Sequence, residues 1–315
     1  MQGSQIWTEK YRPQSFEDIS GQEEIVKRVK ALAETKNIPH MLFCGSPGTG
    51  KTTLALIISK YLHKDNWRNN FLELNSSDSR GIDTIRVQVK DFAKTMAIEA
   101  DAPKIILLDE ADALTKEAQQ ALRRTMETYS NSCRFILSCN VPSKIIDPIK
   151  SRCAIFKFKP LIREDIEKII TKIAEKEKLS IDAESIKLLY ENCGGDVRQL
   201  QNILQSCSAI SDKINKETLS NFLKTTESKN MSEVVTLALN KKFIESRNKL
   251  LDTMLNNGLS GLDVIKQIQK EVINMQIEDL KKLNIIERCG EIEFRLVEGS
   301  DEFIQLESLL AFIAK

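Results

Sequence analysis

The residues from Gly45 to Thr52 read Gly-Ser-Pro-Gly-Thr-Gly-Lys-Thr and fit the pattern G-x-x-x-x-G-K-[ST]. Glycines in such a loop let the backbone bend around an anion with its N–H groups pointing inward. Lys51 is placed to reach the β- and γ-phosphates of a nucleotide, and the Thr52 hydroxyl is placed to ligate Mg²⁺. The chemistry indicated by these residues is the binding of a nucleoside triphosphate.

The segments on both sides of this loop support the same interpretation. Residues 41–44 are apolar and typical of a buried strand, and residues 53–59 have the composition of a helix. The positive end of that helix dipole would face the phosphates. A chance glycine-rich turn is the alternative, and a strand, a Lys-Thr pair and a helix in one register disfavour it.

Asp109 and Glu110 follow the apolar run 104–108, about sixty residues beyond the loop. An acid at the end of a buried strand can hold Mg²⁺, usually through water, and its neighbour can polarise a water aimed at the γ-phosphate. Two surface acids after a strand are the alternative. The buried strand and the distance from the loop favour a catalytic pair.

The chain has 315 residues, of which 41% are apolar and 29% charged, and its net charge is +1. These values are typical of a soluble globular protein of about two or three domains, in which any nucleic-acid binding comes from a local patch. No apolar run approaches the roughly 20 residues of a membrane span, and no secretory signal is found, so we expect no membrane contact. The seven cysteines include no C-x-x-C pair, and neither His40 nor His63 belongs to a Cys/His cluster with metal-ligand spacing. We therefore expect reduced thiols in an intracellular protein and no zinc site.

Predicted strands and helices alternate through the first 160 residues. Besides 41–44, the expected strands are 71–75, 104–109, 134–140 and 154–158, and the expected helices are 23–36, 53–59, 82–98 and 115–129. Continuous apolar strands belong to buried parallel sheets. The pattern predicts an α/β fold with a parallel five-stranded sheet and helices on both of its faces.

After residue 161 only helices are expected. Four short helices, at 163–178, 182–192, 196–208 and 215–224, precede a polar linker at 225–232. Asp196 is a candidate cap for the third of them. From residue 233 onward the chain is predicted to be all helical, with one long helix running from about 262 to 283.

Seven short motifs together resemble those of the replication factor C small subunit family, AAA+ ATPases that load sliding clamps onto DNA. The motifs are Glu9–Pro13, Gly45–Thr52, Glu73–Asp78, Leu107–Asp112, Ser138–Asn140, Ser151–Cys153 and Gly194–Arg198. The resemblance runs from about residue 7 to about 210. The one departure is Ser76, where the family often has Ala. The resemblance implies an AAA+ phosphate-loop ATPase domain at 1–160, a helical lid at 161–226 and an all-α collar at 227–315 that assembles the subunits.

The resemblance also implies roles that spacing alone does not give. Asn140 is similar to the family's sensor-1 residue, which orients the attacking water, and Arg198 to the sensor-2 arginine that reaches the γ-phosphate of its own subunit. Arg152 resembles the arginine finger that completes a neighbouring subunit's ATP site. Asn75 resembles the residue that links bound DNA to the position of Glu110. From the sequence alone, Asn140 could equally end a strand in an ordinary turn, and both arginines could be surface residues.

The site residues implied by the resemblance form three sets. The catalytic set is Lys51, Asp109, Glu110, Asn140, Arg198 and, in trans, Arg152. The ATP-binding set is Tyr11, Arg12, Pro13, Gly45, Ser46, Pro47, Gly48, Thr49, Gly50, Lys51, Thr52, Thr53, Asn140 and Arg198. Thr52 and Asp109 are expected to hold Mg²⁺. The aromatic N-terminal segment could pack on the adenine or simply on the protein, since its composition fits both.

Four basic residues are expected to follow DNA phosphates on the inside of a spiral of subunits: Arg80, Arg86, Lys90 and Lys144. A solvated charged face is the ordinary alternative. Phosphate contact without base reading would suit a protein that acts on any sequence. By the same resemblance, residues 92–103 are a candidate clamp-docking segment, although packing in the helix core explains Phe92 as well.

The predicted function is that of an ATPase subunit in a ring-shaped pentameric clamp loader, with a large subunit and further small subunits as partners. ATP binding would close the ring around an open sliding clamp, and primer–template DNA would trigger hydrolysis. The alternatives are another DNA-acting AAA+ protein (a branch-migration motor or an origin-loading protein), an ATP-binding structural subunit and a small-molecule kinase. No nuclear-type basic cluster stands out, which favours an archaeal cytoplasm over a eukaryotic nucleus.

Overall fold

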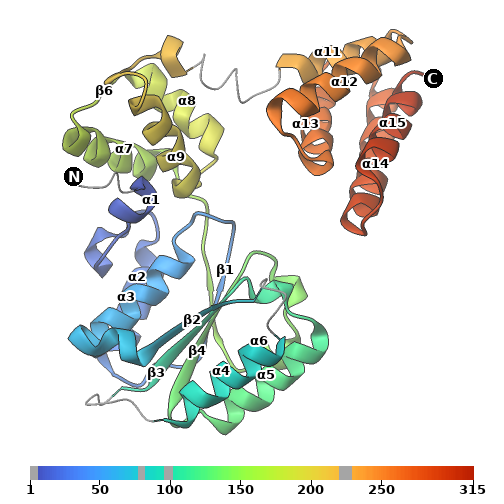
Figure 1. The fold of residues 1–315 in the computed structure, drawn as a ribbon. Helices are drawn as coiled ribbons and strands as arrows, with labels where there is room; N and C mark the ends of the chain where they lie inside the picture. Colours follow the sequence, from blue (N-terminus) through green and yellow to red (C-terminus); the bar gives the residue numbers. More distant parts are fainter. Residues whose placement is uncertain (1–5, 77–81, 96–101, 220–228) are drawn as a thin grey trace. The chain divides into compact units, whose positions relative to one another are not determined.

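The computed structural model describes residues 6–76, 82–95, 102–219 and 229–315 (Figure 1). The chain forms two compact units, Met1–Lys216 and Glu217–Lys315. The first unit contains the phosphate loop and the helices that follow the sheet, and the described residues of the second unit form only helices and their connections. The finer domain boundaries at residues 160 and 226 stay predictions.

The first unit is built on one five-stranded parallel sheet, which confirms the predicted fold class. Its strands lie in the order β2-β3-β4-β1-β5. They are β1 (Met41–Cys44), β2 (Phe71–Asn75), β3 (Lys104–Asp109), β4 (Cys133–Cys139) and β5 (Ala154–Lys157). The carboxyl ends of parallel strands share one edge of the sheet, so Cys44 faces Cys139 and Asn75 faces Asp109.

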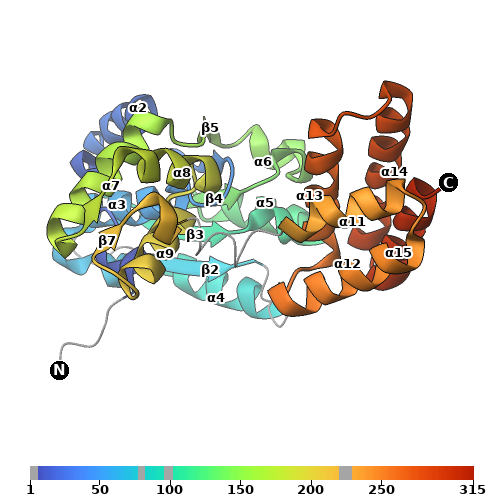
Figure 2. The ribbon, with the colours of Figure 1, turned by 90° about the horizontal axis from the view of Figure 1, so that it is seen from above.

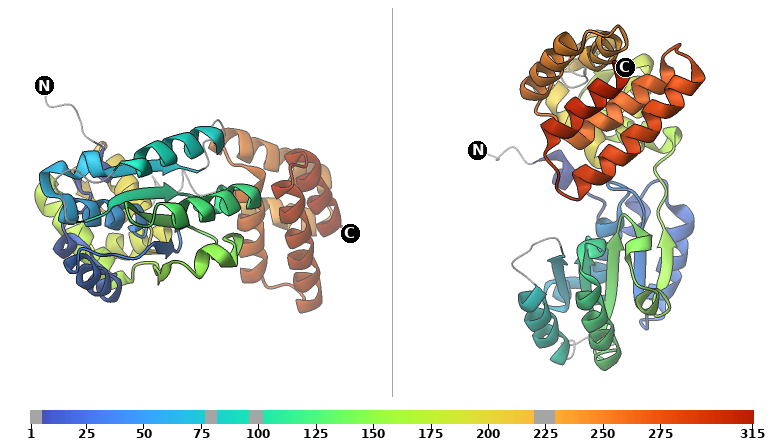
Figure 3. Two further views of the ribbon diagram at one scale, coloured as in Figure 1. Left: turned by 90° about the horizontal axis from the view of Figure 1, so that it is seen from below. Right: turned by 90° about the vertical axis from the view of Figure 1, so that its right-hand side faces the viewer.

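Helices cover both faces of this sheet (Figure 3). Alternate residues of β1 belong to opposite cores: Met41 and Phe43 pack with α2 (Glu23–Glu34) and α3 (Lys51–His63). Leu42 packs on the other face with α4 (Ile82–Lys94), α5 (Lys116–Thr128) and α6 (Asp147–Lys150). In Figure 2, α2 and α4 lie on opposite sides of the strands. Burial on both faces is why the central strands β1, β3 and β4 are largely continuous apolar runs.

Short segments connect these elements and carry several site residues. They are α1 (Trp7–Lys10), η1 (Phe16–Asp18), η2 (Lys64–Asn70), η3 (Ala111–Ala113) and η4 (Pro142–Lys144). Helices α7 (Arg163–Glu177), α8 (Ala183–Cys193) and α9 (Val197–Ser208) follow the sheet. Asp196 caps α9, as predicted, by accepting hydrogen bonds from the N–H groups of Arg198 and Gln199. We call helices α7 to α9 the lid.

The prediction that strands end at residue 161 was wrong in one detail. Two two-residue strands, β6 (Ser180–Ile181) and β7 (Lys213–Ile214), pair in parallel beside the lid helices. Strands this short show no alternation that a sequence pattern could reveal. They join the segment after α7 to the segment after α9.

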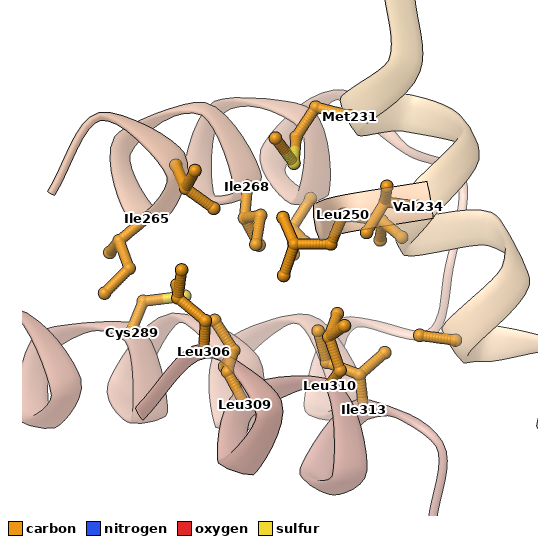
Figure 4. Close-up of a cluster of buried hydrophobic side chains, with 14 of the residues drawn as sticks. Met231, Val234, Leu250, Ile265, Ile268, Cys289, Leu306, Leu309, Leu310 and Ile313 are labelled. Carbon is orange, nitrogen blue, oxygen red and sulfur yellow. The ribbon is translucent and has the colours of Figure 1, made fainter. Parts of the chain in front are cut away.

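The second unit is a helical bundle, as predicted. Its helices are α11 (Lys229–Leu239), α12 (Phe243–Asn257), α13 (Gly261–Asn274), α14 (Asp279–Val297) and α15 (Glu302–Ile313). In Figure 4, side chains that include Met231, Leu250 and Leu306 point toward one another between the helices. The predicted long helix from 262 to 283 is in fact two helices, because Met275 leaves the helical conformation at ψ 147°.

None of the helices in the described ranges is long and apolar enough to cross a membrane.

Candidate functional site

The phosphate loop joins β1 to α3, as the sequence predicts. Gly50 is the N-cap of α3 and has a left-handed backbone with φ 96°, which a residue with a Cβ adopts only at a cost. The first turn of α3 therefore begins at the loop, with its free N–H groups directed at the place where phosphates would bind.

The Lys51 side chain is folded back onto the loop and is only 7% exposed. Its ammonium donates hydrogen bonds to the carbonyl oxygens of Gly45 at 2.7 Å and Ser46 at 2.9 Å, and to Oδ1 of Asn140 at 3.0 Å. Burial lowers the pKa of Lys51, and the negative charge of Asp109 opposes that shift. Two residues of the predicted catalytic set, Lys51 and Asn140, are thus in direct contact.

The two residues expected to hold Mg²⁺ are also in contact. The Thr52 hydroxyl donates to Oδ2 of Asp109 at 2.6 Å, and the other carboxylate oxygen accepts from the Glu110 N–H at 3.0 Å. A hydroxyl and a carboxylate are hard oxygen ligands of the kind that Mg²⁺ prefers, and the ion would take its remaining ligands from water and phosphate. Within the described ranges no cluster of three or more His, Cys, Asp or Glu side chains could hold a metal on its own.

Glu110 has a left-handed backbone, with φ 52° and ψ 40°. This conformation is uncommon in residues other than glycine and costs about 1–3 kcal/mol. It occurs where β3 gives way to η3, at the edge of the sheet that carries the phosphate loop. The carboxylate of Glu110 is exposed and lines the same cavity as Lys51.

A cavity of about 640 Å³ lies between the loop, the lid and the N-terminal segment. Its size is within the range of small-molecule and cofactor sites. The residues of the predicted ATP-binding and catalytic sets that line it are Tyr11, Arg12, Pro13, Pro47, Gly48, Thr49, Gly50, Lys51, Thr52, Thr53, Asp109, Glu110, Asn140 and Arg198. Gly45 and Ser46 contribute through their carbonyl oxygens, which accept from Lys51.

The lid is attached to the phosphate loop by its backbone. The N–H of Val197, the first residue of α9, donates to the Gly48 carbonyl at 3.2 Å, and the Leu161 N–H donates to Gly195 at 3.3 Å. The carboxylate of Asp196 lies so close to Gly48 that a Cβ on Gly48 would be 1.7 Å from Oδ1. Sequence reasoning missed this contact, because it joins residues that are far apart in the chain.

The N-terminal segment lines the cavity and also packs on the lid, whereas its contact with adenine stays a prediction. The Tyr11 hydroxyl donates to Glu177 of α7, and the Lys10 ammonium lies 2.5 Å from the same carboxylate. Burial, together with this hydrogen bond to Glu177, raises the pKa of Tyr11. The Trp7 N–H donates to Oε1 of Gln205 in α9 at 3.0 Å.

Comparison with known proteins decides the family. Residues 41–161 match the model of the ATPase family associated with various cellular activities, and residues 226–312 match the replication factor C C-terminal domain. The chain is 51% identical over 306 residues to the replication factor C small subunit of Methanococcus maripaludis, covering 97% of each chain. It is 46% identical to that of Archaeoglobus fulgidus over 100% of this chain and 98% of the relative. The chain belongs to the replication factor C small subunit family.

Solved structures show the same fold in a more distant protein. The Holliday junction branch migration motor RuvB of Thermotoga maritima superposes with a TM-score of 0.58 over 72% of this chain and 78% of its own. The sequence identity is 17%, so this likeness shows the fold alone. The AAA match and the family together support nucleotide binding and ATPase activity at the cavity.

Arg152, the candidate finger of this replication factor C subunit, lies away from the cavity. Its side chain is exposed, with Nη2 2.6 Å from Oε1 of Glu127 in α5 and Nη1 donating to the Pro148 carbonyl at 2.8 Å. Among the described residues, those that line the cavity do not include Arg152.

The four candidate DNA-binding residues of this family member are described to different extents. Arg80 lies outside the described residues, and Arg86 lies in α4 with its side chain outside them. Lys90 of α4 and Lys144 of η4 are exposed. Helix α4 follows β2 and η4 follows β4, so both begin at the carboxyl edge of the sheet, where the cavity also lies.

The candidate clamp-docking segment is described only in part. Phe92 is partly buried against the core on the α4 side of the sheet, as helix packing predicts. Residues 96–101, including Met96 and Ile98, lie outside the described residues.

Proposed function

We propose that this chain is an ATP-hydrolysing small subunit of a ring-shaped pentameric clamp loader, which opens a sliding clamp and loads it onto primer–template DNA. One observation carries the proposal. A cavity lined by the residues predicted to act on ATP in cis lies in a chain about half identical, over nearly its whole length, to replication factor C small subunits.

The proposed chemistry is in-line attack of water on the γ-phosphate. Lys51 would leave the loop carbonyls for the β- and γ-phosphates, and Asn140, released from Lys51, would orient the water. Glu110 would polarise that water, and Arg198 would approach the γ-phosphate from the lid. Mg²⁺, held through Thr52 and Asp109, would neutralise phosphate charge.

Arg152 is proposed to act on the ATP of a neighbouring subunit. Its exposed guanidinium is held by Glu127 and Pro148 on the surface of its own subunit. A finger stabilises the charge that builds up on the γ-phosphate in the transition state. This role makes hydrolysis depend on assembly.

The helical second unit is proposed to assemble the ring, with the large subunit and further small subunits as partners. Helix α14 carries four large apolar side chains that are 63–65% exposed in the single chain: Leu280, Leu283, Phe294 and Val297. Exposed apolar surface of this kind is typical of protein–protein contact sites. Deletion of residues 233–315 should leave a monomer that still binds ATP.

DNA is proposed to bind through phosphate contacts of Lys90 and Lys144, together with Arg80 and Arg86. Removing the charge that meets one phosphate should flatten the salt dependence of binding by roughly 0.9 in log–log slope, whatever the DNA sequence. The variant Lys90→Gln/Lys144→Gln isolates the two described residues. An unchanged slope would mean that these two are only a solvated face. The relatives are archaeal, and we propose a cytoplasmic location.

The deciding experiment uses the assembled complex with its large subunit. ATP turnover is measured alone, with a sliding clamp, with primed DNA, and with both, and clamp transfer to DNA is followed in parallel. We expect the highest turnover with both and clamp retained on primed DNA. An ATP turnover rate that is the same with and without clamp, combined with movement of the complex along DNA, would instead identify a branch-migration motor.

A further inference from the structure

Gln201 is a buried polar residue of α9 for which the catalytic scheme above has no use. It is 5% exposed and lines the cavity. With 3.6 residues per turn, Arg198, Gln201 and Gln205 lie on one face of α9. Arg198 is at the end near the phosphate loop, and Gln205 accepts from Trp7 in the N-terminal segment. Gln201 therefore lies between the phosphate end of the cavity and the end formed by residues 8–14.

Within the described part of the chain, the Gln201 side chain has no hydrogen-bond partner. Two other buried glutamines show how unusual this is. Gln22 donates to the Lys159 carbonyl at 2.7 Å, and Gln119 bonds three backbone groups. Polar side chains in a protein interior are normally hydrogen-bonded. Because the Gln201 side chain lines the cavity, its amide is available to bond a ligand there.

Part of the wall of this cavity is apolar and would suit a flat apolar ring. Ile169 and Ile173 of α7 line the cavity, and Ile173 is only 1% exposed. Leu161 and Val197 line it as well. A nucleotide whose phosphates lie on the loop would extend its base along α9 toward these side chains.

A side-chain amide offers a donor and an acceptor side by side. Adenine presents the matching pair on one edge, with N7 as acceptor and the N6 amino group as donor, whereas guanine presents two acceptors, N7 and O6. We propose that Gln201 selects adenine in this cavity, with Nε2 donating to N7 and Oε1 accepting from N6. This inference rests on the proposed binding of ATP at the same site.

The test compares three nucleotides that the protein does not hydrolyse: ADP, 7-deaza-ADP, which lacks the N7 acceptor, and GDP. Affinities are measured by titration calorimetry for the full chain and for Gln201→Met, which keeps the length of the side chain and removes the amide. The wild-type chain should bind ADP more tightly than either analogue. Gln201→Met should bind ADP about 5- to 150-fold more weakly and should no longer distinguish ADP from 7-deaza-ADP.

Two variants serve as controls. Gln199→Met removes an amide from the same helix at an exposed position and should leave all three affinities unchanged. Gln201→Glu keeps the acceptor for N6 and removes the donor to N7, so it should also lose sensitivity to 7-deaza-ADP. Thermal unfolding of each variant shows whether the lid remains folded.

The proposal is overturned if the ratio of the ADP affinity to the 7-deaza-ADP affinity is the same for Gln201→Met as for the wild-type chain. It is also overturned if the wild-type chain and Gln201→Met prefer ADP over GDP by the same factor. Failure of the proposed function has a different signature, because Lys51→Ala would then bind ADP as tightly as the wild-type chain does. Loss of binding in Lys51→Ala, with unchanged base selectivity in Gln201→Met, would exclude only the role of Gln201.

Discussion

The carbonyl oxygen of Gly48 accepts a hydrogen bond from the N–H of Val197 at 3.2 Å. Gly48 is in the middle of the phosphate loop, and Val197 is the first residue of the lid helix α9. The loop expected to hold phosphate is therefore also the surface on which the lid rests. A substitution at either residue should therefore affect both the phosphate loop and the lid.

Gly48→Ala should release the lid in the absence of nucleotide. The new Cβ would lie 1.7 Å from Oδ1 of Asp196, at a residue whose φ is +68°, so the carboxylate and the start of α9 must move. Hydrogen exchange at the Val197 amide should become at least tenfold faster, since loss of the bond opens that site.

Gly50→Ala is the matched control for this prediction. Gly50 also has positive φ, at +96°, but no atom lies within 4 Å of its Cβ position. It should lose about 1 kcal/mol of stability through backbone strain, with α9 still protected. Removing the clashing carboxylate in Gly48→Ala/Asp196→Ala should restore part of the protection. Equal exchange in the two single variants would show that the contact with Asp196 does not hold the lid.

Lys51→Ala and Glu110→Gln should separate binding from turnover. Lys51→Ala deletes the cation expected on the β- and γ-phosphates and should abolish ATP binding. Glu110→Gln leaves every phosphate contact in place and should lower turnover by about 10²–10⁴-fold with little change in affinity. Equilibrium binding and single-turnover hydrolysis measure the two effects. Normal turnover by Glu110→Gln would remove it from the catalytic role.

Arg152→Ala should bind ATP normally and hydrolyse it about 10³–10⁵-fold more slowly. The defect should be transferable between subunits. In mixtures of Arg152→Ala with Lys51→Ala chains, some interfaces combine an intact phosphate loop with an intact Arg152, and activity should exceed that of either variant alone. An assembled mixture no more active than its components would contradict a role in trans.

ATP affinity should fall at alkaline pH, beginning at a lower pH than the one at which an ordinary lysine loses its proton. Burial lowers the pKa of Lys51 below 10.5 in the empty site, whereas bound phosphates would favour the ammonium and raise it again. Between these two pKa values, binding takes up a proton, so affinity decreases as pH rises. Titration calorimetry in buffers of different ionisation enthalpy would detect that proton. Binding without proton uptake up to pH 10.5 would contradict this prediction.

Acid should destabilise the sheet-containing unit through His40. Burial, and then the charge of Arg134, lower the pKa of His40 from 6.5 to about 4, and its Nδ1 accepts from the Phe135 N–H at 3.0 Å. Between pH 6.5 and about 4 the unfolded chain therefore binds a proton that the folded chain excludes, and the free energy of unfolding falls as pH falls. The loss attributable to His40 should approach about 3 kcal/mol.

His40→Asn offers an acceptor that does not titrate, so its free energy of unfolding should depend less steeply on pH in this window. Denaturant unfolding of both proteins at pH 7, 5.5 and 4.5 compares the slopes. Parallel slopes would mean that other groups cause the acid sensitivity.

Local patterns were enough to predict the sheet and much of the site. The central strands β1, β3 and β4 are buried on both faces, so each appears as a largely apolar run, and Asp109 and Asn140 come at the ends of two of those runs. The glycines and Lys51 lie within eight consecutive residues. Features of this kind are set by neighbours in the chain and are visible without a structure.

Features that depend on tertiary contact were not predictable. Nothing near Gly48 indicates that Asp196 will pack against it, because that contact depends on how the lid docks. The break between α13 and α14 was missed because residues 275–278 contain no Gly or Pro, and apolar residues continue on both sides. The importance of Gln201 likewise appears only when its burial and its missing partner are known.

The ion pair between Arg152 and Glu127 bears on how readily subunits could respond to one another. Both side chains are more than a third exposed, and such pairs contribute about 0–1 kcal/mol. An isolated chain thus presents a nearly neutral spot at the place where the proposed assembly needs a cation. Because so little energy holds the pair together, the triphosphate of an adjoining subunit could draw the guanidinium away with almost no penalty. The charge around Glu127 on each subunit would then depend on whether the neighbouring subunit carries nucleotide.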